Sequence, residues 1–138
     1  MLSIRMRFAT VVGSLLTATA LVAMASPAMA SGRSCGGGEA FSSQTCININ
    51  GTGLKIVSDT GTYENLVEGL TRPDVHIELS GPHGLIKNCP ATSVDDGQII
   101  SCTWSPNHTE TGGDYYATAW FCYPNCIVLA QAVLDVHS

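Results

Sequence analysis

The sequence predicts an all-β protein: a small antiparallel two-sheet sandwich of about seven strands, stabilised by disulfides. Three observations support this fold class. The chain has 138 residues, which suits one domain. Its apolar residues recur in short runs that alternate with polar ones and are separated by turn residues. It also contains six cysteines, an even number that suits a small disulfide-stabilised fold.

Residues 1–30 have the pattern of a secretory signal peptide. Arg5 and Arg7 are followed by an uncharged stretch rich in Ala, Val and Leu, and Ala28-Met29-Ala30 supplies the small residues of a cleavage site. We expect this segment to be removed and the mature protein to be secreted, in the medium or associated with the cell envelope. No later segment is long and apolar enough to span a membrane.

The mature chain is acidic. Without residues 1–30, the chain has four Lys and Arg residues and eleven Asp and Glu residues, which gives a net charge of −7. Nucleic-acid binding depends on neutralising phosphates with clustered cations, and this sequence has no such cluster. We therefore expect no nucleic-acid partner.

The six cysteines are expected to form three disulfides, because exported proteins meet an oxidising environment. They are Cys35, Cys46, Cys89, Cys102, Cys122 and Cys126. Six cysteines allow fifteen pairings, which sequence alone does not decide. We favour sequential pairing, since Tyr123-Pro124-Asn125 is a turn that would bring its two flanking cysteines together. The main alternative joins Cys46 or Cys102 to Cys122 across two sheets.

The predicted domain covers residues 45–138 and follows a flexible lead at 31–44. Ile47 and Ile49 begin the alternation, and Asn50-Gly51 indicates a hairpin turn or a bulge. Leu54 and Ile56 belong to the next strand.

The segment Tyr63–Leu70 is the one helical candidate. Tyr63, Leu66, Val67 and Leu70 are spaced so that they would share one face of a helix. The segment is short, so we expect a turn or two at most.

Alternation resumes in the second half of the domain. The expected strands lie near 75–80, 85–89, 100–104, 115–122 and 126–136. Gly113-Asp114-Tyr115-Tyr116 and the strand after it resemble the penultimate strand of many immunoglobulin-like sandwiches, in which a tyrosine bonds back to the backbone. This resemblance implies immunoglobulin-like general architecture and carries no catalytic residues.

Aromatic side chains gather around the last turn. Alternation places Tyr115, Ala117, Ala119 and Phe121 on one face of their strand and Tyr116, Thr118, Trp120 and Cys122 on the other. The two faces of one strand cannot both line the same core, so we expect one aromatic set to be partly exposed. The alternative is that the N-terminal segment or a loop covers Trp120. The candidate binding surface is Tyr116, Trp120, Tyr123 and Asn125.

No catalytic or metal-binding spacing is present. His76, His83, His108 and His137 fall in separate segments, without the paired spacing of metal ligands. A nucleophile-elbow motif is also missing, and paired cysteines leave no thiol nucleophile. We therefore expect neither an enzyme nor a cofactor or metal. The leading hypothesis is a secreted non-catalytic binding module for a protein or carbohydrate surface; the alternative is an inhibitor of an extracellular protease acting through loop 121–126.

Overall fold

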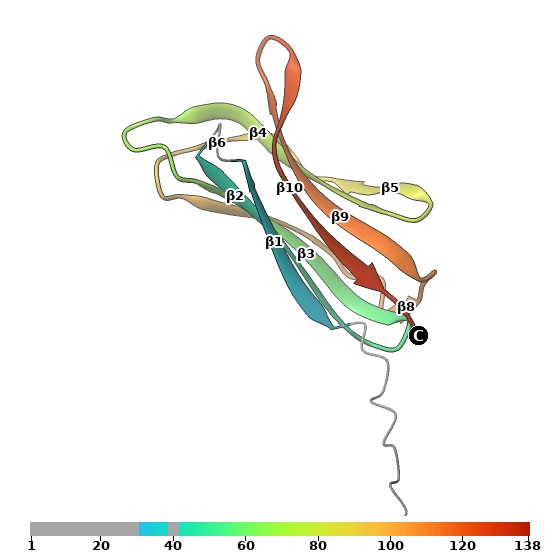
Figure 1. The fold of residues 1–138 in the computed structure, drawn as a ribbon. Helices are drawn as coiled ribbons and strands as arrows, with labels where there is room; N and C mark the ends of the chain where they lie inside the picture. The colour runs from blue at the N-terminus through green and yellow to red at the C-terminus, as the bar shows by residue number, and fades with distance from the viewer. Residues whose placement is uncertain (1–30, 39–41) are drawn as a thin grey trace, which may run out of the picture.

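The computed structural model describes residues 31–38 and 42–138, and that part of the chain is built from strands and turns without helix. Two antiparallel sheets of five strands each pack face to face (Figure 1). The first sheet, in spatial order, contains β1 (Gly32–Gly38), β2 (Ser43–Thr52), β3 (Lys55–Asn65) and β7 (Ile99–Trp104), with β8 (His108–Thr109) also paired to β3. The second contains β10 (Cys126–Val136), β9 (Gly113–Cys122), β4 (Arg72–Gly81) and β5 (Gly84–Asn88), with β6 (Thr92–Val94) also paired to β4.

The all-β class and the two antiparallel sheets are confirmed, but the strand number is not. The described chain forms ten strands where about seven were expected. Two of the additional strands, β6 and β8, have three and two residues. Segments this short show no readable alternation, so only their pairing with β4 and β3 reveals them.

The third additional strand, β1, lies where a flexible lead was expected. Residues 32–38 pair with β2 over seven register positions instead of remaining free. Its glycines allow close packing against β10: a Cβ on Gly36 would lie 1.9 Å from the carbonyl oxygen of Gln131. The glycine-rich sequence therefore indicates a close contact between the two sheets at this edge (Figure 1).

The predicted helix at Tyr63–Leu70 is wrong. Strand β3 continues to Asn65, with Tyr63 buried in the core, and a turn follows. Leu66 and Leu70 are 50% and 43% exposed, so the apparent apolar stripe is not buried as a unit. Pairing of β3 with both β2 and β7 satisfies its backbone and overrides the local helical spacing.

The core lies between the sheets and is formed by alternate residues of the long strands. Its buried side chains from the first sheet include Ile47, Ile49, Ile56 and Tyr63, and those from the second include Val75, Ile77, Leu79, Tyr115, Ala117 and Ala119. Gly61 allows the closest approach of the two layers, because a Cβ there would lie 2.9 Å from both Ala117 and Leu79. The bulge predicted at Asn50-Gly51 is present in the β2–β3 pair.

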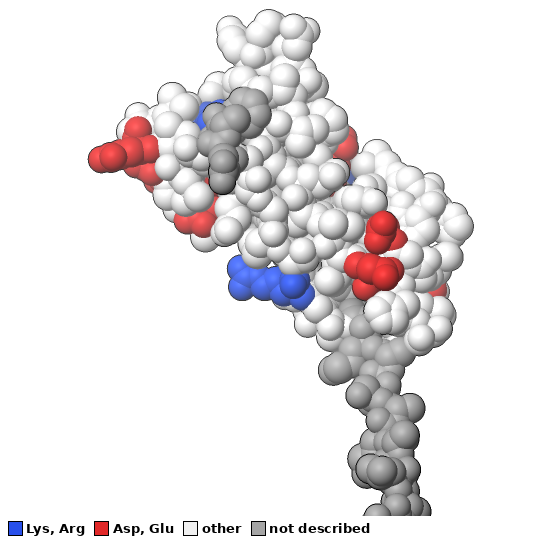
Figure 2. Space-filling view, viewed as in Figure 1, with Lys and Arg blue, Asp and Glu red and all other residues white. Residues whose placement is uncertain are grey.

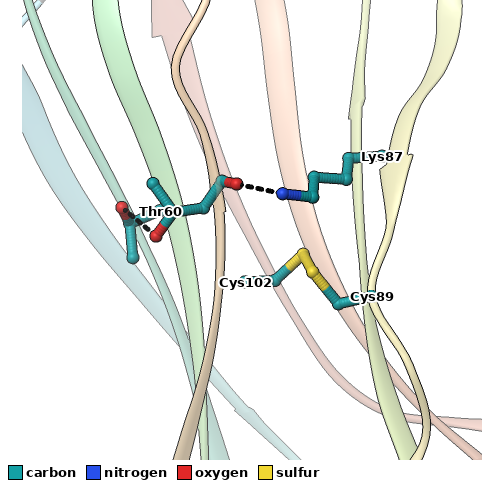
Figure 3. Close-up of a disulfide and its surroundings, with 5 residues drawn as sticks. Thr60, Lys87, Cys89 and Cys102 are labelled. Carbon is teal, nitrogen blue, oxygen red and sulfur yellow. Dashed lines mark hydrogen bonds between the residues drawn. A yellow bond between two sulfur atoms is a disulfide. The ribbon is translucent and has the colours of Figure 1, made fainter.

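The sequential disulfide pairing is confirmed. Cys35–Cys46 joins β1 to β2, and Cys122–Cys126 joins β9 to β10. Cys89–Cys102 links the two sheets, as Figure 3 shows, and the Lys87 ammonium donates a hydrogen bond to the Thr103 carbonyl beside it. The alternative that placed an inter-sheet bridge on Cys122 is therefore wrong, because that cysteine bonds within its own hairpin.

The two sheets are thus held together at both lateral edges, by glycine packing between β1 and β10 and by a disulfide from Cys89, just after β5, to β7. Three disulfides indicate an oxidising environment of the extracellular type. The predicted signal peptide at 1–30 lies outside the described residues. Among the described residues, no helix has the length and apolar character needed to cross a membrane.

Candidate binding surface

The β9–β10 hairpin is the part of the molecule that positions the predicted surface. Residues 115–134 contain no Asp, Glu, Lys or Arg. The end of the hairpin projects beyond the two sheets (Figure 1), and in the view of Figure 2 this projection shows no charged side chain. An uncharged projection on an acidic protein is a distinct surface, because the rest of the molecule carries its net charge.

The projecting tip is a short turn closed by a disulfide. Cys122 and Cys126 are register partners at the ends of the two strands, and they enclose Tyr123, Pro124 and Asn125. The Tyr123 side chain is 69% exposed, and Asn125 is also exposed. A covalently closed turn presents these side chains with little conformational freedom left to lose on binding.

The tip also exposes apolar side chains that the sequence analysis did not single out. Ile127 and Val128, the first residues of β10 after Cys126, are 41% and 40% exposed. They lie beside Phe121 and Trp120 in the β9–β10 register. The absence of charged residues from positions 115–134 is the sequence signal that would have indicated them.

The outer face of the second sheet carries the other two predicted residues. Trp120 is flanked in register by His76 of β4 and Val128 of β10. Tyr116 lies four residues along the same face of β9, and both aromatic side chains are partly exposed. The indole N–H of Trp120 is buried and finds no acceptor among the described residues. One row of side chains therefore runs from the tip along the outer face of β9.

The predicted division of the aromatic residues between the two faces is confirmed. Tyr115, Ala117 and Ala119 are buried in the core, with Phe121 packed against it. The Tyr115 hydroxyl donates a 2.8 Å hydrogen bond to the Thr111 carbonyl, which is the backward contact expected of this tyrosine. Burial raises the pKa of Tyr115, and the negative charges of Glu110 and Asp59 raise it further.

Tyr116 stands in a different electrostatic environment. Its hydroxyl donates a 3.3 Å hydrogen bond to Oδ2 of Asp114. The charge of Asp114 is the main cause of the raised pKa of Tyr116, so this hydroxyl remains a neutral donor at physiological pH. Its single proton goes to Asp114, so the hydroxyl can accept a hydrogen bond from a ligand at this end of the row.

The histidines do not converge on a metal site. No group of three or more metal-binding side chains occurs in the part of the chain that the structure describes. His108 pairs with Glu110 at 2.8 Å, and His83 contacts the Thr111 hydroxyl at 2.9 Å. A hollow of about 370 Å³ borders His76 and residues 88–91, next to the outer face that carries Trp120.

The one strongly perturbed acid is remote from this surface. Asp59 is fully buried in β3, and burial raises its pKa to about 7. A carboxyl group without solvent access cannot reach a substrate, so it offers no acid–base chemistry at the surface. Sequence reasoning missed Asp59, because a register shift between Ile56 and Ser58 reverses the alternation that Ile56 begins and turns Asp59 to the inner face.

The arrangement defines a disulfide-stabilised, two-sheet β protein with a projecting hairpin whose residues 115–134 carry no charged side chain. Comparison of the chain with protein-family models, with curated proteins and with solved structures gives no match.

Proposed function

We propose that this is a secreted, non-catalytic binding module that contacts a protein or carbohydrate surface through the β9–β10 hairpin. The observation that carries the proposal is that Tyr116 and Trp120 lie on the outer face of β9, which leads directly into a disulfide-closed tip that exposes Tyr123. Tyrosine and tryptophan combine a large apolar area with a polar group, and they dominate the energetics of binding surfaces. The absence of charged side chains from residues 115–134 supports a neutral ligand surface.

The polar side chains beside the aromatic row support the same function. Gln131 donates a 2.9 Å hydrogen bond to the Thr118 hydroxyl, between the positions of Trp120 and Tyr116 on the outer face. Asn125 at the tip adds an amide that both donates and accepts. We also propose the immunoglobulin-like architecture as the frame for this surface, supported by the contact between the Tyr115 hydroxyl and the Thr111 carbonyl.

The test is co-sedimentation of the exported protein with insoluble cell-envelope material and with neutral polysaccharides. We expect retention that a soluble fragment of the polymer competes away. Tyr123→Ala and Trp120→Ala should each weaken retention by roughly tenfold or more, as expected for aromatic residues at the centre of a binding surface. Leu85→Ala is the matched control, because this 63% exposed apolar side chain lies on β5, outside the hairpin.

Unchanged retention of both aromatic variants would refute the site. No retention of the wild-type protein on any polymer would instead favour a soluble protein partner.

The alternative is inhibition of an extracellular protease through loop 121–126. It is favoured by the same closed turn, because an inhibitory loop must project and resist rearrangement, and Tyr123 is 69% exposed. In that case a target protease should titrate stoichiometrically with the protein while the loop stays intact. Rapid cleavage of the loop without loss of protease activity would exclude this function.

A further inference from the structure

The Cys122–Cys126 disulfide has an ionisable neighbour outside its own hairpin. The Nδ1 atom of His76, on β4, lies 4.0 Å from the Cys122 sulfur. The other ring nitrogen, Nε2, lies 3.7 Å from Oε1 of Glu78 on the same strand. A sulfur, an imidazole and a carboxylate therefore follow one another across the outer face of the second sheet. In such an arrangement the carboxylate orients the imidazole, and the imidazole can exchange a proton with the sulfur.

The two cysteines of this disulfide differ in exposure. Cys126 is exposed at the start of β10, whereas Cys122 is half-buried beside His76. The hollow of about 370 Å³ next to His76 brings solvent to this side of the sheet. An incoming thiolate therefore meets the Cys126 sulfur first, and the Cys122 sulfur next to the imidazole becomes the leaving group.

We propose that Cys122–Cys126 is a thiol–disulfide exchange site, with His76 as the group that receives the Cys122 leaving sulfur and Glu78 as the residue that positions His76. The co-reactant is a thiol, either a small molecule or a cysteine of another protein. This chemistry goes beyond the binding function and does not depend on it.

In the exchange step, an external thiolate attacks the Cys126 sulfur. A mixed disulfide forms between that thiol and Cys126 while the Cys122–Cys126 bond breaks, and its electron pair goes to the Cys122 sulfur. The protonated His76 ring donates its Nδ1 proton to this thiolate. Exchange is faster when the leaving sulfur is stabilised, and a cation beside a thiolate provides that stabilisation.

Among the described residues, the charged group in contact with the His76 ring is the Glu78 carboxylate, and Asp74 precedes His76 by two residues on β4. From β9 it meets Trp120 and Cys122, and the end of β5 with the segment after it presents residues 88–91, none of which is charged. The contact with Glu78 therefore orients the ring, and the exchange rate should depend on pH because the ring must carry a proton in order to donate it.

The other two disulfides serve as internal comparators. In Cys89–Cys102, the Cys102 sulfur belongs to a residue that is 1% exposed, between the sheets. In Cys35–Cys46, the guanidinium of Arg33 lies 3.6 Å from the Cys46 sulfur. That permanent cation can stabilise a thiolate but has no proton to give up near neutral pH. Among the side-chain contacts of the described residues, only Cys122–Cys126 has an imidazole at its sulfur.

In the experiment, the fully oxidised exported protein is incubated with excess reduced glutathione at several pH values from about 5.5 to about 8.5. Imidazole groups generally change their protonation in this range. Samples are quenched in acid and alkylated, and peptide mapping gives the exchange rate of each disulfide. Per glutathione thiolate, we expect Cys122–Cys126 to react roughly tenfold or more faster than Cys89–Cys102. This ratio should fall as pH rises and the His76 ring loses its proton.

His76→Gln should slow exchange at Cys122–Cys126 by roughly tenfold and abolish the pH dependence of its rate per thiolate. Glu78→Gln should shift that pH profile with a smaller loss of rate, which a purely structural role would not do. Both variants should leave exchange at Cys35–Cys46 unchanged, and this also reports that they fold.

Equal rates at Cys122–Cys126 and Cys89–Cys102 in the wild-type protein, or a flat pH profile, would overturn the proposal without any variant. So would a His76→Gln variant that exchanges at the wild-type rate. Retention on polymers is measured separately in the oxidised protein, so failure of the exchange site and failure of the binding surface are distinguishable.

Discussion

Asp59 lies in the core of the protein with both carboxyl oxygens buried and without a hydrogen-bond partner in the described residues. Its neighbours in the first sheet are Ile49 and Trp104, which offer no compensating charge. Loss of hydration disfavours the ionised carboxylate and raises the pKa of Asp59 to about 7. The folded protein therefore holds a proton that the unfolded chain has released at the same pH.

This difference predicts a fall in stability with rising pH. Between the unfolded pKa near 3.8 and the folded pKa near 7, the native state binds the extra proton, so the free energy of unfolding decreases as pH rises and then levels off. The total loss is at most about 4 kcal/mol. The Asp59→Asn side chain cannot ionise, so the free energy of unfolding of this variant, measured in urea, should not show this decline with pH.

The result is obtained from the difference between the stability–pH curves of the wild-type protein and of Asp59→Asn, because the histidines contribute equally to both curves. Curves that stay parallel from acid to neutral pH would show that Asp59 does not titrate abnormally.

At the scale of a single strand, β1 shows how tight packing depends on glycine. Gly36 lies against the backbone of β10, where a Cβ would be 1.9 Å from the Gln131 carbonyl oxygen. No rotation of a side chain relieves a clash with backbone, so β1 must move away if any larger residue stands there.

We therefore expect Gly36→Ala to destabilise the protein by about 1–3 kcal/mol, the range of overpacked sites. Gly37→Ala is the matched control on the same strand, because its Cβ would meet the Ser43 carbonyl oxygen at 3.3 Å, which a small shift accommodates. Urea unfolding gives the two energies, and hydrogen exchange of β1 amides locates the opening. Equal effects of both substitutions would contradict the close contact between β1 and β10.

For the whole molecule, the three disulfides have different mechanical roles. Cys89–Cys102 joins the two sheets and closes a chain segment with a sequence separation of 13, whereas Cys122–Cys126 closes a turn with a separation of 4. A longer closed segment restricts the unfolded chain more. The inter-sheet bridge should accordingly contribute more to stability than the bridge at the tip.

Replacing Cys89 and Cys102 together by Ala should lower the free energy of unfolding by about 3 kcal/mol, against about 2 kcal/mol for the Cys122 and Cys126 pair. Thermal and urea unfolding of the two double variants give this order directly. The tip variant should also keep the sheets intact, as judged by circular dichroism. The reverse order of stability would show that the inter-sheet bridge is not the main covalent tie.

Local chemistry was sufficient to predict the all-β class, the pairing of neighbouring cysteines and the two faces of β9. Each follows from residues close in sequence: alternation along a strand, a turn between Cys122 and Cys126, and the period of two that separates Tyr115 from Tyr116. The candidate surface was predictable to the same extent, because its aromatic residues lie within one hairpin.

The features that depend on pairing between segments distant in sequence were decided only by the tertiary structure. It extended β3 through Tyr63 in place of a helix, because hydrogen bonds to two neighbouring strands outweigh a short helical pattern. It placed His76 beside Trp120 and Cys122, since the register of β4 against β9 is set by packing and not by either strand alone. It also enclosed Asp59, because burial depends on the second sheet that covers the inner face of the first.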